Sequence, residues 1–120
     1  MILNNYDGLN CIGLTLYKWK NKRAEIWFIR PGYEIVEHSH PKEDVELMYL
    51  FGSTVFYRRD TRSGICEFAS PKFLRSFSVK HFHFHWFTVG WLPLVFINFQ
   101  TFLNGCEPKS ASKDFQIYGL

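Results

Sequence analysis

From residue 81 to residue 106 the chain carries no Lys, Arg, Asp or Glu. A run of this length without charge is expected to be buried, either in a bilayer or in a protein core. The stretch also holds three histidines, the breakers Gly90 and Pro93 and several side-chain amides, all of which are costly in lipid. Its aromatic and β-branched content instead predicts two buried strands, broken at residues 89–91, and no membrane association.

The rest of the chain also consists of short apolar segments separated by turn residues, and no segment has a capped apolar period of helical length. Hydrophobic residues make up 47% and aromatic residues 19% of the sequence, which excludes disorder. We therefore predict an all-β fold of antiparallel strands in one domain, residues 1–120, with its core at about 11–104. The expected strands are 11–19, 24–29, 33–40, 45–51, 54–59, 65–68, 75–87 and 92–102. A loose tail is expected at 107–114, with a short edge strand at 115–118.

Charge and cysteine content narrow the function classes. Fourteen basic residues against eleven acidic ones give a formal net charge of +3, which by itself does not indicate nucleic acid binding. Three widely spaced cysteines, Cys11, Cys66 and Cys106, do not suggest a disulfide framework. No signal peptide is visible at the start of the sequence. We expect a cytoplasmic protein, in the host cytoplasm if it is viral.

The residues that suggest chemistry are histidines on predicted strands. In the segment 33–40, alternation places Glu34, Val36, His38 and His40 on one face. In the segment 75–87, His81, His83 and His85 alternate with aromatic residues, so they also share a face. This second pattern equally fits a strand with one aromatic face in the core and a half-polar face outside.

The spacing around the first pair of histidines resembles the first motif of the cupin superfamily. That motif runs glycine, five residues, His, one residue, His, three or four residues, Glu, six residues, glycine. Gly32, His38 and His40 fit its first half, and Gly52 fits its end. The carboxylate departs from the pattern. Asp44 has the motif's spacing from the histidines but would place the closing glycine one position too late, whereas Glu46 lies deeper in the strand and has the longer reach.

The second cupin motif places a histidine two residues before Phe on a late strand. His85-Trp86-Phe87 resembles it, although the expected Pro-x-Gly turn is missing. The resemblance covers about residues 32–99 and implies a cupin-like β-barrel or jelly-roll sandwich. It also implies a divalent metal, Zn, Fe, Mn or Ni, bound by His38, His40, Glu46 and His85, with Asp44 and His83 as the alternatives.

Two further residues are candidates for binding a small polar ligand in the barrel. His83 lies on the same face as His85. Arg58 belongs to the basic group at 57–62, which could bind an anion. Arginines beside a hairpin turn also commonly form a solvated tip, and that reading stays open.

Three functions remain open at the level of sequence. The first is a metal-dependent cupin isomerase, epimerase or dioxygenase. The second is a non-enzymatic protein that has lost the metal-enzyme role. It would capture a small ligand, or it would be a virus-type accessory protein that inhibits a host protein. The third is a structural oligomer, and the family resemblance implies a homodimer. No serine elbow, phosphate-binding glycine loop or activated cysteine supports covalent catalysis.

Overall fold

The computed structural model describes residues 2–106, with side chains for residues 8–106. All regular secondary structure in this part of the chain is β-strand, as predicted. The strands are β1 (Ile2–Asp7), β2 (Cys11–Trp19), β3 (Lys22–Ile29), β4 (Glu34–Ser39), β5 (Glu43–Phe51), β6 (Phe56–Asp60), β7 (Cys66–Ala69), β8 (Ser76–Val79), β9 (His83–Thr88) and β10 (Leu94–Phe102).

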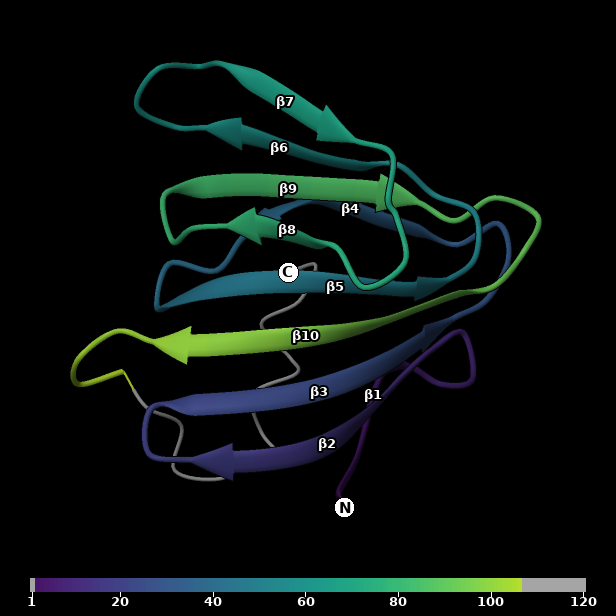
Figure 1. The fold of residues 1–120 in the computed structure, drawn as a ribbon, viewed down its shortest axis with the longest axis horizontal. Coiled ribbons are helices and arrows are strands. Elements are labelled where there is room, and N and C mark those ends of the chain that lie inside the picture. The colour runs from purple at the N-terminus through teal and green to yellow at the C-terminus, as the bar shows by residue number, and fades with distance from the viewer. Residues whose placement is uncertain (1, 107–120) are drawn as a thin grey trace.

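The strands form two antiparallel sheets (Figure 1). The six-stranded sheet has the order β1-β2-β3-β10-β5-β8, and the four-stranded sheet has the order β4-β9-β6-β7. Two late strands therefore lie between early ones: β10 between β3 and β5, and β9 between β4 and β6. The sheets enclose a hydrophobic core to which buried residues of both contribute.

Strand alternation builds the core. Burial alternates without a break along β10, so every second side chain from Leu94 to Phe102 points inward. Phe56 of the four-stranded sheet contacts Phe77 and Phe96 of the other sheet, at ring-centroid distances of 5.8 and 6.2 Å. Such aromatic pairs across the interior hold the two layers together.

The predicted strand at 75–87 is two strands that belong to different sheets. β8 pairs with β5 in the six-stranded sheet, and β9 pairs with β4 and β6 in the other. A tight turn separates them: the His83 amide donates to the Lys80 carbonyl at 2.9 Å, and the Lys80 amide donates to His83 Nδ1 at 2.8 Å. The prediction of one continuous strand is wrong because this turn has neither Gly nor Pro to mark it.

The strand that carries His38 contains a β-bulge. Ile35 pairs with Phe87 and His38 pairs with His85, so two residues of β4 lie opposite the single residue between them on β9. The bulge puts both Ile35 and His38 in the interior and leaves Val36 exposed. The prediction that Val36 shares a face with His38 is therefore wrong, because strict alternation does not hold across a bulge.

The strand predicted at 11–19 is confirmed as β2, whereas β1 was not predicted. The tail at 107–114 and the edge strand at 115–118 lie outside the described residues. Among the described residues no helix has the length and apolar character needed to cross a membrane.

Candidate metal centre

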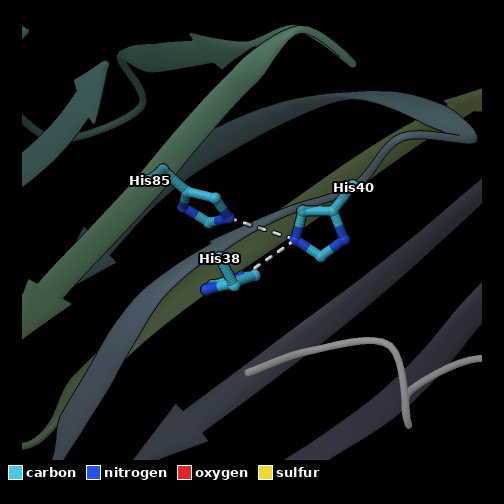
Figure 2. A group of neighbouring side chains, drawn as sticks. All are labelled: His38, His40 and His85. Carbon is cyan, nitrogen blue, oxygen red and sulfur yellow. Dashed lines mark hydrogen bonds between the residues drawn. The ribbon is translucent and has the colours of Figure 1, made fainter. Parts of the chain in front are cut away.

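Three of the predicted ligands meet in the interior, as Figure 2 shows: His38 on β4, His40 just after it, and His85 on β9. His40 Nε2 lies 3.0 Å from His38 Nε2 and 3.1 Å from His85 Nε2. One ring nitrogen from each residue lies within 4.8 Å of the others. The antiparallel pairing of β4 with β9 sets His38 directly opposite His85, and the turn that follows β4 brings in His40.

All three imidazoles are buried, and burial favours their neutral form. Desolvation lowers the pKa of His38, although its contact with the Val36 carbonyl works in the other direction. Burial, and then the neighbouring histidines, lower the pKa of His40 and of His85 well below 6.5. Three neutral imidazoles are the protonation state that a metal ion requires of its histidine ligands.

The backbone determines which nitrogen of His38 faces the cluster. Its Nδ1 lies 2.7 Å from the Val36 carbonyl oxygen, which only accepts hydrogen bonds, so Nδ1 carries the proton and Nε2 presents a lone pair. His40 Nε2 then has two nitrogen neighbours and at most one proton to share between them while it is neutral. It cannot donate to His38 and at the same time accept from His85. A cation among the three nitrogens would relieve this conflict.

The spacing of the nitrogens suits a transition metal. Zn–N bonds of about 2.0–2.1 Å in a tetrahedron put ligand nitrogens roughly 3.3–3.4 Å apart. Two of the three nitrogen–nitrogen separations, 3.0 and 3.1 Å, are close to this value, and the third is no more than 4.8 Å. Three histidines would also leave one position of a tetrahedral ion for water or substrate. The residues present therefore fit a divalent metal.

The structure does not bring the predicted carboxylates to the histidines. On β5, Val45 and Leu47 are buried whereas Asp44 and Glu46 are only partly buried, so these two carboxylates face away from the core. Asp44 is bound on that side by His81, whose Nδ1 lies 2.9 Å from Asp44 Oδ1. The prediction that Glu46 is a metal ligand is therefore corrected. Glu46 has the opposite alternation from the inward-facing residues of its strand, so its side chain lies on the other face from the histidines.

Glu43, which the sequence reasoning missed, is the carboxylate beside the cluster. It is fully buried, and its Oε1 lies 3.8 Å from His40 Nδ1. It also accepts a hydrogen bond from Gln100 Nε2 at 2.5 Å. Its alternation with Val45 and Leu47 was the available signal, since inward positions of a strand recur every second residue. The strand was predicted to begin at Val45, which placed Glu43 in a turn.

The two predicted ligand-binding residues lie near the cluster but have other contacts. His83 is buried, and its Nδ1 accepts the Lys80 amide, as described for the turn. Arg58 lies opposite His85 in the β6–β9 pairing, but its guanidinium forms an ion pair with Glu67 and donates to the Ser78 carbonyl. Neither contributes a nitrogen to the histidine cluster.

A small cavity adjoins the cluster. Its volume is about 30 Å³, which is room for one or two water molecules. Its polar lining consists of His38, His85 and Asn98, and most of its other lining residues are apolar: Cys11, Trp27, Ile29, Ile35, Val45, Leu47, Phe87 and Phe96. The space beside His38 and His85 is therefore small and lined mainly by apolar side chains.

No protein-family model and no curated protein matches the sequence, but solved structures resemble the fold. KdgF from Halomonas sp. superposes with a TM-score of 0.68 at 12% identity, covering 88% of this chain and 89% of that one. An RmlC-like cupin from Shewanella frigidimarina gives 0.62 at 15%, covering 87% and 86%. The Cnp3 cupin domain of Schizosaccharomyces pombe gives 0.65 at 10%, covering 78% and 61%.

These likenesses extend over most of this chain, and their low identities make them evidence of fold alone. Together with the two antiparallel sheets, they show that the chain has the cupin fold, as predicted.

Proposed function

We propose that this chain is a small metal-binding protein of cupin fold, which holds a divalent ion, Zn, Fe, Mn or Ni, and binds a small polar molecule beside it. The ligands would be His38, His40 and His85. The observation that carries the proposal is the convergence of three buried imidazole nitrogens, two pairs of which are 3.0 and 3.1 Å apart. Neutral imidazoles suit each of these ions, so the donor set does not select among them.

A bound ion of this class supplies Lewis acidity, a lowered pKa of coordinated water for zinc, or oxygen chemistry for iron. The chain's own part is to hold the three nitrogens together, to keep the imidazole rings neutral by burial, and to exclude bulk water. The Val36 carbonyl fixes the proton of His38 on Nδ1, so that Nε2 is available as a ligand. These are the conditions for holding such an ion, and the enzyme that the proposal includes is a metal-dependent isomerase, epimerase or dioxygenase.

A second candidate, a non-enzymatic protein, is favoured by the size of the cavity. About 30 Å³ beside the histidines admits water but no molecule of metabolite size unless side chains move. A metal that stabilises the fold, or capture of a ligand elsewhere in the barrel, fits this observation. A role as an accessory protein that inhibits a host protein, and a homodimer, stay predictions.

Metal content of the purified protein tests the proposal. Incubation of metal-stripped protein with each of the four ions, followed by desalting and elemental analysis, should give one ion per chain for at least one of them. The H38A/H40A double variant should bind less than one tenth of that amount while keeping the circular dichroism spectrum of a folded β protein. The H81A variant removes a histidine from the outer side and should bind as the wild type does.

The opposite results decide between the candidates. A wild-type chain that takes up no stoichiometric metal contradicts the proposal. Release of a small molecule on denaturation, detected by mass spectrometry in both the wild type and the double variant, would instead support ligand capture without metal.

A further inference from the structure

A row of buried polar side chains crosses three neighbouring strands of the six-stranded sheet and ends at the histidines. Arg23 on β3, Gln100 on β10 and Glu43 on β5 are each at most 1% exposed. Arg23 Nε donates to Gln100 Oε1 at 2.6 Å, and Gln100 Nε2 donates to Glu43 Oε1 at 2.5 Å. The amide of Gln100 thus links the guanidinium to the carboxylate, one hydrogen bond on each side.

The far end of this row meets the side of His40 that does not face the cluster. His40 uses Nε2 toward His38 and His85, and its Nδ1 is the nitrogen nearest Glu43, at 3.8 Å from Oε1. An N–H···O hydrogen bond spans 2.7–3.2 Å. A relative shift of about 1 Å would therefore close this contact.

We propose that Glu43 is a positioning residue for the metal site, which accepts the Nδ1 proton of His40 and so fixes Nε2 as the ligand atom. The inference rests on the proposed metal-binding function. Histidine ligands commonly donate their second N–H to a carboxylate or a carbonyl, which sets the tautomer and raises the basicity of the ligand nitrogen. His38 already has such a partner in the Val36 carbonyl. Glu43 would be the equivalent for His40.

The geometry favours this role for Glu43 over direct coordination. The cluster of ligand atoms within 4.8 Å of one another consists of three histidine nitrogens and includes no carboxylate from the described residues. The Glu43 oxygen lies on the Nδ1 side of His40, whereas the other two histidines lie on its Nε2 side. A carboxylate behind the imidazole orients the ring but does not occupy a coordination position.

The other two members of the row hold the carboxylate in place. A buried carboxylate is costly unless it is hydrogen-bonded and near a positive charge. Gln100 supplies the hydrogen bond, and Arg23 supplies a cation one residue further along. Arg23 also lies 3.8 Å from the buried Glu25 carboxylate, so its charge is shared.

Cobalt binding separates Glu43 from a matched control on the same strand. Metal-stripped wild type, E43Q and E46Q would be titrated with Co²⁺, following the visible absorption bands. E43Q replaces the buried carboxylate beside His40 by an amide, and E46Q makes the same change on the outer side of β5. We expect E43Q to weaken Co²⁺ binding by about 10- to 100-fold. E46Q should stay within twofold of the wild type, and the saturated spectra of all three should coincide.

Other outcomes overturn the inference. Wild-type affinity in E43Q contradicts it, and so does a saturated E43Q spectrum with changed band positions and intensities, because that marks Glu43 as a direct ligand. If E43Q does not fold, Q100L replaces it: removing the amide that holds Glu43 should weaken binding severalfold, and unchanged affinity contradicts the inference. A wild type that binds no cobalt, zinc, manganese, iron or nickel overturns the proposed function itself.

Discussion

Gly32 and Gly52, the two glycines that flank the histidine motif, have different structural roles. Gly32 has a φ of +79° and nothing within 4 Å of where a Cβ would lie. Gly52 has a φ of +115°, and a Cβ there would come within 2.0 Å of the Pro93 carbonyl oxygen and 2.7 Å of Leu94 Cα. The first glycine thus serves only the turn. The second also allows the end of β5 to pass against the backbone at the start of β10.

This difference predicts unequal effects of the same substitution. G32A should cost about 1–2 kcal/mol of unfolding free energy, which is the strain of an L-residue at positive φ. G52A should cost more than about 3 kcal/mol, since the backbone it meets cannot rotate away as a side chain can. Urea denaturation of both variants measures the two values. Equal losses would contradict the close approach at Gly52.

At the scale of the strand, the bulge in β4 decides which residues face the site. Without it, Ile35 and His38 would point to opposite sides, because their numbers differ by three. The extra residue shifts the inward–outward alternation of the strand by one position, so Ile35 and His38 both face the interior. The outer face then takes Val36, which is 47% exposed, whereas Ile35 is 6% exposed.

Two alanine substitutions test the bulge. Truncation of the buried Ile35 should lower the unfolding free energy by about 2–4 kcal/mol, whereas V36A should change it by less than about 1 kcal/mol. Chemical denaturation monitored by tryptophan fluorescence gives both values. Strict alternation would reverse the order, so a larger loss in V36A would show that the strand is regular.

The sequence predicts the parts of this structure that local patterns determine. Turn residues mark most strand ends, and Gly32, His38 and His40 have a spacing that resembles the first half of the first cupin motif. His85 could be chosen from three alternating histidines. The bulge, the split of residues 75–87 and the role of Glu43 were missed. The bulge and the split depend on which distant strand a segment pairs with, and no local pattern carries that information. Glu43 was missed because its strand was predicted to begin at Val45, although its alternation with Val45 and Leu47 was visible in the sequence.

At the scale of the whole molecule, burial of the histidines makes stability depend on pH. Burial holds the pKa of His40 and of His85 well below 6.5, whereas in the unfolded chain they titrate near 6.5. Below that pH the unfolded state binds more protons than the folded state. The free energy of unfolding is therefore at its full value above pH 6.5 and falls as the pH drops toward the folded-state pKa values.

Metal-free protein should show this dependence in thermal melts between pH 8 and pH 5. Each buried histidine contributes a slope of up to about 1.4 kcal/mol per pH unit below 6.5. The H38A/H40A variant retains only His85 of the three and should show a shallower slope over the same range. A melting temperature that stays level from pH 7 to pH 5 would contradict neutral buried imidazoles.

The strand order also bears on how the chain acquires its structure over time. Because β9 lies between β4 and β6, and β10 between β3 and β5, neither sheet can be completed before the last third of the chain arrives. His85 is 45 residues beyond His40, so the cluster forms only when that late segment docks. A chain dominated by such distant pairings is expected to fold slowly. Binding of a metal by all three histidines would then report that this late segment has docked.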